Sequence, residues 1–211
     1  MKLYLCSYRI QLPEALARLV GKPLKGTTVA VIPNAKDYYA DRARAYKIKE
    51  MHAYLREHGL QPETVDLRDY TDGQALLAKL KMFDMLWVAG GNTFCLREAM
   101  RSSGFEDIVH ELLENVVYAG ESAGALVAGT SLKGIEPADI PEFAGMIIED
   151  GLRIVPKFIL PHAGSVYFAE ANETALAVHS GEEIIEIADN QAYVIDGDRT
   201  ELLTAPIAPE A

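Results

Sequence analysis

The sequence predicts an α/β fold, a three-layer α/β/α sandwich in which helices cover both faces of a mostly parallel central sheet. Short, nearly all-apolar runs alternate with helical-looking segments, which is typical of such sheets. Apolar residues make up 49% of the 211 residues, an ordinary share for a globular protein. We find no repeat, low-complexity tract or linker, so we expect residues 1–211 to form a single domain.

The first half of the chain predicts five strands, at residues 2–7, 27–32, 63–67, 84–89 and 116–119. The second run is rich in β-branched residues, which favour strands. Between the strands, apolar residues near helical spacing predict a helix over 37–58, and a further helix is expected over 104–114. We expect four basic residues of the longer helix to form a solvated face: Arg42, Arg44, Lys47 and Lys49.

The second half predicts helices over 123–129 and 164–179. Its strands are expected at residues 157–160, 184–187, 192–195 and 201–203. These late strands lie closer together in sequence than the early ones. We therefore expect them to form either an antiparallel edge of the main sheet or a small second sheet.

The formal net charge of −11 argues against nucleic acid and anionic membranes as partners. No apolar run is long enough to span a membrane, and Arg9 interrupts the N-terminal apolar stretch, so we expect a cytoplasmic protein without a signal peptide. Cys6 and Cys95 are far apart and lack metal-ligand spacing, so we expect free buried thiols and no metal.

Two glycine-rich segments follow predicted strands, and ligands of such sheets bind beyond the carboxyl ends of the strands. In the stretch YAGESAGA (118–125), Gly120-x-Ser122-x-Gly124 has the pattern of a nucleophile elbow, a tight strand-to-helix turn that exposes its central side chain. The backbone N–H of Ala123 would then be free to face an oxyanion. The alternative interpretation is a tight turn with only a structural role.

The other segment, AGGNT (89–93), contains a second candidate oxyanion donor, the N–H of Gly91. Asn92 is expected to cap the helix that follows. Of the five histidines, His162 alone follows an apolar run at what we expect to be the carboxyl end of a strand, on the same edge as Ser122. It is therefore the candidate general base.

A catalytic histidine needs an orienting carboxylate, and spacing alone leaves several candidates open. Asp139 and Asp150 lie between Ser122 and His162, whereas Asp189 follows His162 after another apolar run. The position at a strand end favours Asp189. The prolines that flank Asp139 indicate an irregular loop.

Taken together, these segments resemble the peptidase E (α-aspartyl dipeptidase) and cyanophycinase family of serine peptidases across most of the chain. The matching pieces are AGGNTFCL (89–96), GESAGALVAG (120–129), ADIP (138–141), LPH (160–162) and the strand–Asp–strand pattern around residue 189. The resemblance implies a fold like that of class I glutamine amidotransferases (flavodoxin-like), with serine in place of cysteine at the elbow.

By matching motifs, the resemblance implies that Ser122 is the nucleophile, His162 the base and Asp189 the acid, with Asp139 as second choice. Gly91 and Ala123 match the oxyanion-hole donors. The implied activity is hydrolysis of small peptides such as dipeptides, with N-terminal aspartate as one candidate specificity, through an acyl-enzyme and without a cofactor. A homodimer is possible.

The sequence departs from the family where the substrate carboxylate would bind. Residues 163–172, which supply a basic side chain in the family, contain neither Arg nor Lys here. Asn92, Glu121 and Glu170 are further candidates for substrate contacts, and the two glutamates could meet an α-ammonium group. The alternatives to a peptidase are an esterase or amidase with the same triad and a non-catalytic binding protein on this fold.

Overall fold

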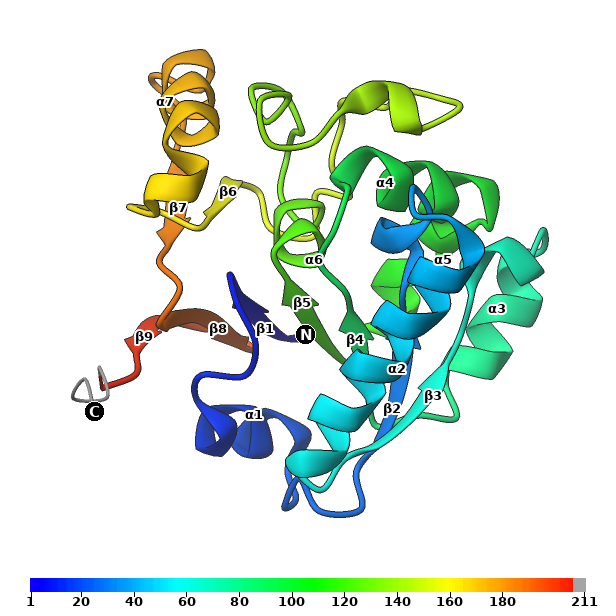
Figure 1. The fold of residues 1–211 in the computed structure, drawn as a ribbon. Coiled ribbons are helices and arrows are strands. Elements are labelled where there is room, and N and C mark those ends of the chain that lie inside the picture. The colour runs from blue at the N-terminus through cyan, green and yellow to red at the C-terminus, as the bar shows by residue number, and fades with distance from the viewer. Residues whose placement is uncertain (207–211) are drawn as a thin grey trace.

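The computed structural model describes residues 1–206, which contain a seven-stranded sheet in the order β3-β2-β4-β5-β1-β8-β9 (Figure 1). Its strands are β1 (Lys2–Cys6), β2 (Thr28–Ile32), β3 (Gln61–Thr64), β4 (Met85–Val88), β5 (Val117–Glu121), β8 (Gln191–Asp196) and β9 (Arg199–Thr204). The first five run parallel, and β8 and β9 add an antiparallel edge next to β1. The predicted mostly parallel sheet is confirmed.

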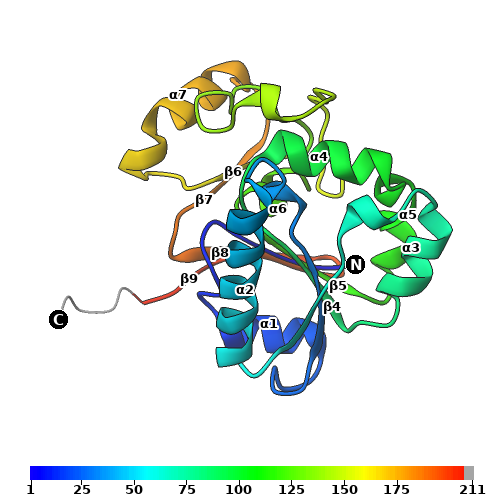
Figure 2. The same ribbon diagram turned by 45° about the vertical axis from the view of Figure 1, so that its right-hand side comes forward.

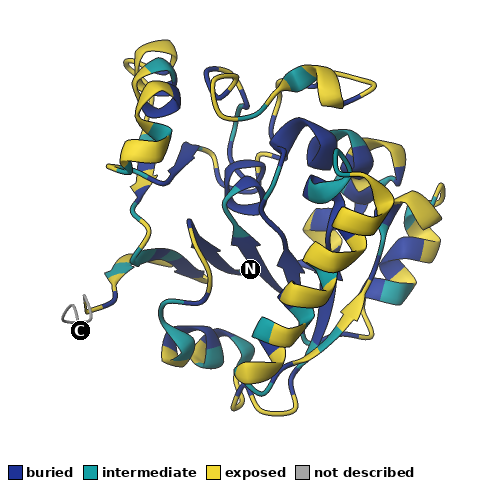
Figure 3. Cartoon of the chain, in the orientation of Figure 1, coloured by how far each residue is buried: buried dark blue, intermediate teal, exposed yellow. Residues whose placement is uncertain are grey.

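Helices cover both faces of this sheet. One face carries α1 (Pro13–Val20) and α2 (Asp41–Glu57); the other carries α3 (Gly73–Leu80), α4 (Thr93–Ser102), α5 (Phe105–Leu112) and α6 (Ala123–Leu126) (Figure 2). The buried strands between these layers explain the continuous apolar runs of the sequence (Figure 3). Helices α1 and α3 are short and did not emerge from the sequence.

The register of the central strands aligns their carboxyl ends. Val88 of β4 pairs with Gly120 of β5, and Glu121 of β5 pairs with Cys6 of β1. Ser7, the glycine-rich segment after β4 and Ser122 therefore follow three adjacent strands at one edge of the sheet. This alignment is what positions the candidate site.

The two strands around His162 form a separate sheet. β6 (Phe158–Pro161) pairs in parallel with β7 (Ile184–Ile187), and α7 (Ala169–Val178) lies between them in the chain, apart from the main sheet in Figure 1. Both alternatives for the late strands thus occur. The expectation that residues 157–160 share the sheet edge of Ser122 is wrong, because among the described strands β6 pairs with β7 alone.

Single-turn 3₁₀ helices lie in the connections at four places within residues 1–206: Asn34–Lys36, Leu67–Asp69, Pro141–Phe143 and Val166–Phe168. Two of them shift predicted boundaries. The helix expected over 37–58 begins only at residue 41, and the strand expected over 63–67 lies at 61–64 because the chain turns after Val65. The helix expected over 123–129 ends at Leu126.

Arg44 corrects the expectation of a solvated basic face on α2. Its guanidinium is buried and pairs with Asp37 at 2.6 Å and with Asp66 at 2.7 Å. The neighbouring Arg42, Lys47 and Lys49 are exposed as expected.

Within residues 1–206, none of the helices combines the length and apolar character that a membrane span requires.

Candidate active site

Ser122 occupies a sharp turn between β5 and α6, with a φ of +50°. A β-carbon at Gly120 would lie 2.3 Å from the carbonyl oxygen of Gly124, and one at Gly124 would lie 2.2 Å from that of Val88. Both flanking positions therefore exclude any side chain. The serine between two glycines is thus explained by the close approach of the backbone on either side of the turn, which leaves the Ser122 hydroxyl facing a cavity.

Three polar side chains form a continuous chain of contacts at this turn. Ser122 Oγ lies 2.9 Å from His162 Nε2, and His162 Nδ1 lies 2.6 Å from Asp189 Oδ1. Because a carboxylate only accepts hydrogen bonds, Nδ1 carries the proton in this arrangement and Nε2 is free to accept from the serine. His162 is 8% exposed, whereas the side chain of Asp189 is half-exposed.

Of the two acids favoured from sequence, only Asp189 contacts His162. Asp139 accepts hydrogen bonds from the backbone N–H and the hydroxyl of Thr93, at 2.8 and 2.5 Å. Burial raises the pKa of Asp139, and the two hydrogen bonds from Thr93 oppose this shift. Asp139 lines the same cavity as Ser122, but its hydrogen bonds go to Thr93 at the start of α4.

His162 is fixed by contacts that the sequence did not indicate. Its φ is +59°, its N–H donates to Ser7 Oγ at 2.9 Å, and the Ser7 hydroxyl donates to the Ile187 carbonyl at 2.6 Å. The amide of Asn172 donates to the His162 carbonyl, and the Phe168 ring stacks on the imidazole. The one signal in the sequence for these contacts was the position of Ser7 at the end of a predicted strand.

The candidate oxyanion donors lie on either side of the serine. Among the described residues, neither the N–H of Gly91 nor that of Ala123 has an internal acceptor. Gly91 has a φ of +141°, and a β-carbon there would lie 2.2 Å from the Ala35 carbonyl oxygen. A β-carbon on Gly90 would lie 3.0 Å from that of Ser122. The glycine pair therefore brings backbone amides directly beside the hydroxyl.

The cavity in front of Ser122 is small, about 40 Å³, and mostly apolar. Its apolar lining includes Leu126, Ile135, Leu160, Phe168 and Ala171. No lysine or arginine is among the described residues that line it. Over residues 1–206, no three His, Cys, Asp or Glu side chains come together in a way that could hold a metal ion.

The other sequence candidates are not brought into this cavity. Asn92 is buried as the cap of α4: its Oδ1 accepts from the N–H of Cys95, and its Nδ2 donates to the Ile140 carbonyl. Glu121 accepts from the backbone N–H of Arg9 and lines a separate cavity of about 340 Å³. Its side chain leaves β5 on the face covered by α2, away from the hydroxyl.

Glu170 lies in the first turn of α7, where its side chain is exposed, and it lines neither of the two cavities. The sequence of residues 163–172 brought Glu170 close to His162 along the chain, but the helical turn directs the exposed glutamate to solvent. Ala171 and Asn172, its neighbours, line the cavity instead. Neither of the two glutamates suggested for an α-ammonium group therefore lines the cavity in front of Ser122.

A family model of the peptidases designated S51 matches residues 7–203, which include the elbow, the histidine and Asp189. The chain belongs to peptidase family S51. Family membership makes it a peptidase, and it confirms the resemblance drawn from the motifs.

Curated relatives of this S51 peptidase are also named as peptidases. The uncharacterized peptidase Lmo0363 of Listeria monocytogenes is 28% identical over 82% of this chain and 84% of its own length. A protein named Peptidase E from Streptomyces coelicolor is 27% identical over 90% of this chain and 77% of its own length.

Two solved structures share the fold of this S51 peptidase. A Listeria monocytogenes EGD-e protein described as a candidate peptidase E superposes with a TM-score of 0.79 at 26% identity, covering 96% of this chain and 98% of its own. A peptidase from an acI-B1 Actinobacterium superposes with a TM-score of 0.66 at 18% identity, covering 97% and 94%. The second likeness concerns the fold alone.

Proposed function

We propose that this S51 peptidase is a serine exopeptidase that hydrolyses small peptides through Ser122, His162 and Asp189. The observation that carries the proposal is the pair of contacts at His162, 2.9 Å to the serine hydroxyl and 2.6 Å to the carboxylate. A nucleophile within hydrogen-bond distance of a base, and a base held by a third group, is the geometry that acyl transfer requires.

In the proposed reaction, His162 Nε2 takes the proton of Ser122 as the hydroxyl oxygen attacks the peptide carbonyl. The carbonyl oxygen becomes an oxyanion that accepts hydrogen bonds from the N–H groups of Gly91 and Ala123. Collapse of this intermediate breaks the C–N bond, and His162 gives its proton to the leaving amine. The acyl group is now an ester of Ser122, and water attacks its carbonyl while His162 takes a proton from the water. The ester C–O bond then breaks, the acid leaves, and His162 returns the proton to the Ser122 oxygen.

The cavity in front of Ser122 supports a substrate group that is compact and uncharged. Its walls are mostly apolar and lack a cation among the described residues, and the half-buried Asp139 carboxyl would oppose a second carboxylate there. We therefore propose dipeptides with a small apolar residue at this position as better substrates than aspartyl dipeptides. The name Peptidase E of several relatives makes the aspartyl dipeptides the comparison of choice.

A panel of dipeptides tests the proposal: Ala-Leu, Asp-Leu, Asn-Leu, Glu-Leu and β-Asp-Leu, each with wild type and with Ser122→Ala. We expect turnover of Ala-Leu above Asp-Leu by wild type and none by the variant. Preference for Asp-Leu would overturn the assigned specificity but keep the serine peptidase. Labelling of Ser122 by a fluorophosphonate without turnover of any dipeptide would refute the proposed dipeptidase activity and leave a serine hydrolase with another substrate, such as an ester or amide. Turnover by Ser122→Ala would refute the assignment of Ser122 as the nucleophile.

A further inference from the structure

A short segment from a distant part of the chain contacts the loop that contains Gly90 and Gly91, beside Ser122. Residues 34–36 form a single turn after β2, and the Ala35 carbonyl accepts a hydrogen bond from the N–H of Asn92 at 2.7 Å. The next side chain, Lys36, extends to the carbonyl oxygen of Gly90, with its Nζ at 2.7 Å. Two consecutive residues of this turn thus contact the loop on both sides of Gly91.

The carbonyl that Lys36 binds belongs to the peptide unit that carries the Gly91 N–H. The structure contains no cis peptide bond within the described residues, so this C=O and N–H point in opposite directions. A cation at the oxygen fixes the plane of the peptide and directs the N–H away from Lys36. It also withdraws electron density from the nitrogen, which strengthens the N–H as a donor.

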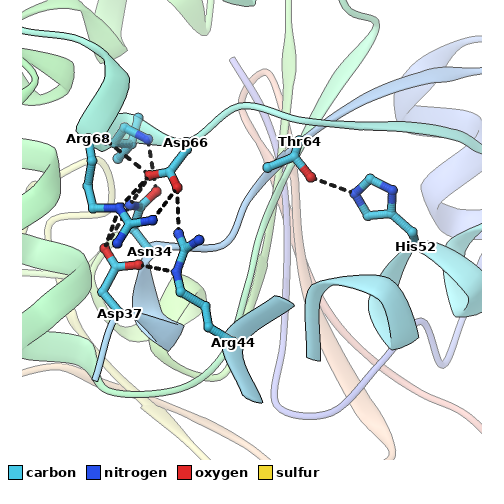
Figure 4. A network of polar contacts seen from close by, with 8 residues as sticks. Asn34, Asp37, Arg44, His52, Thr64, Asp66 and Arg68 are labelled. Atoms are coloured by element: carbon cyan, nitrogen blue, oxygen red, sulfur yellow. Dashed lines mark hydrogen bonds and ion pairs between the residues drawn. The ribbon is translucent and has the colours of Figure 1, made fainter. Parts of the chain in front are cut away.

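The turn that carries Lys36 is itself held rigidly. Asn34 is fully buried; its amide donates to Asp37 and Asp66, both at 2.8 Å, and its oxygen accepts from the N–H of Leu67 at 3.0 Å (Figure 4). Arg44 closes the network by pairing with the same two carboxylates. The position of the turn, and with it the reach of Lys36, is therefore determined by the fold.

The ammonium of Lys36 is not neutralised by an ion pair. Among the described residues, no carboxylate lies within ion-pair distance of its Nζ, which donates a hydrogen bond to the Gly90 carbonyl. Burial lowers the pKa of Lys36, the nearby Glu121 opposes this shift, Lys47 adds to it and Glu50 opposes it. All four groups face the cavity of about 340 Å³ on the far side of Gly90 from the serine.

We infer that Lys36 is a positioning residue for the oxyanion hole, which orients and polarises the Gly90–Gly91 peptide so that the Gly91 N–H stabilises the developing oxyanion at Ser122. The inference rests on the proposed function, since it assigns the Gly91 amide to the oxyanion of acyl transfer. Lys36 touches neither substrate nor the reacting atoms. It acts through one peptide bond.

The first arm of the test needs no activity. Residues 90–91 are the only Gly-Gly pair in the sequence, so cell-free synthesis with glycine labelled at both the carbonyl carbon and the nitrogen gives one carbonyl-correlated amide signal. We expect Lys36→Met to shift the Gly90 carbonyl carbon to lower frequency, as loss of a hydrogen bond does. Lys47→Met is the matched control, because Lys47 lines the same cavity but pairs with Glu50. An unchanged signal in Lys36→Met would overturn the inference.

The second arm measures the second-order rate constant for phosphonylation of Ser122 by a fluorophosphonate, whose reaction also builds negative charge in the oxyanion hole. We expect Lys36→Met to lower this constant by about tenfold, less than the loss of a whole donor, with Lys36→Arg restoring most of it and Lys47→Met leaving it unchanged. An equal loss in Lys47→Met, or a wild-type rate in Lys36→Met, would overturn the inference.

Folding and the proposed function are controlled separately. Thermal unfolding of each variant shows whether Lys36→Met is folded, and Lys36→Arg keeps the test valid if it is not. Absence of labelling in wild type would refute the proposed serine nucleophile. Labelling of wild type together with equal labelling of Lys36→Met refutes only the role of Lys36.

Discussion

The phenyl ring of Phe168 lies nearly parallel to the imidazole of His162, with ring centroids 4.2 Å apart and planes 10° apart. Phe168 comes from the turn before α7, and it also lines the cavity in front of Ser122. One aromatic ring therefore both limits rotation of the base and forms a wall of the cavity. The two roles can be separated by measuring rate and affinity independently.

Phe168→Ala should lower kcat, because the imidazole then samples orientations that do not face Ser122. We expect a loss of roughly fivefold, in line with an aromatic contact of about 1 kcal/mol. Tyr167→Ala is the control, since that neighbouring ring is 92% exposed. Steady-state kinetics on the best dipeptide of the panel measure both. Equal effects of the two substitutions would exclude a specific role for the stacked ring.

Ser7→Ala should weaken both the fold and the reaction. The Ser7 hydroxyl accepts from the His162 N–H and donates to the Ile187 carbonyl. Its loss leaves the buried His162 N–H without a partner, whereas the Ile187 carbonyl keeps its hydrogen bond from the N–H of Ala163. We expect a cost of about 2 kcal/mol in the free energy of unfolding and a lower kcat. Ser103→Ala removes an equally buried hydroxyl, just after α4, whose one hydrogen bond among the described residues goes to the Met100 carbonyl of that helix. A kcat as high in Ser7→Ala as in Ser103→Ala would contradict this prediction.

Asp189→Asn should lower kcat by roughly 10²- to 10⁴-fold, because an amide at this position no longer selects the tautomer of His162 that accepts from Ser122. Asp139→Asn removes the other candidate charge and keeps the shape of the cavity wall. Its effect on kcat should be small beside that of Asp189→Asn. Rates of acyl-enzyme formation with a chromogenic ester measure both variants, and a larger loss in Asp139→Asn would reverse the assignment of the acid.

Asp66 should make stability depend on pH in the acidic range. Although burial raises the pKa of Asp66, hydrogen bonds from Arg68 and Asn34 and the charge of Arg44 hold it well below the ordinary 3.8. The contribution of Asp66 is therefore fully present above the unfolded value and is lost as the pH falls through the folded one.

Chemical unfolding of wild type and Asp66→Asn between pH 7 and pH 3 measures this contribution. We expect the variant to lose about 2 kcal/mol at pH 7 and to show a shallower fall toward acid. Asp69→Asn replaces an exposed carboxylate close by, for which no ion pair is found among the described residues, and should behave as wild type. Parallel pH curves for wild type and Asp66→Asn would refute the role of Asp66.

The sequence was sufficient for the elements that have strong local signals. Apolar runs revealed the strands of the central sheet, and the elbow pattern located Ser122 at the end of β5, where the structure has it. Position at a strand end selected His162 and Asp189, which lie in contact. Helices α1 and α3, each of eight residues, were missed, although α5 has the same length and was found.

What the sequence could not supply depends on pairings between distant segments. The separation of β6 and β7 into their own sheet follows from tertiary packing, since an apolar run does not identify its partner strand. Arg44 looked like part of a solvated stripe because its partners, Asp37 and Asp66, lie in two other segments. Glu121 was placed beside the nucleophile by adjacency in sequence, although successive strand residues face opposite sides.

Ser122 and His162 are carried by two separately paired sheets, joined beside the site by the hydroxyl of Ser7. Three residues of the cavity wall, Leu160, Phe168 and Ala171, come from the same part of the chain as the base. This part of the cavity wall and the nucleophile are therefore encoded in different stretches of sequence. Substitutions in residues 158–187 can reshape the cavity while the elbow is inherited unchanged, which gives this architecture a direct route to new specificities.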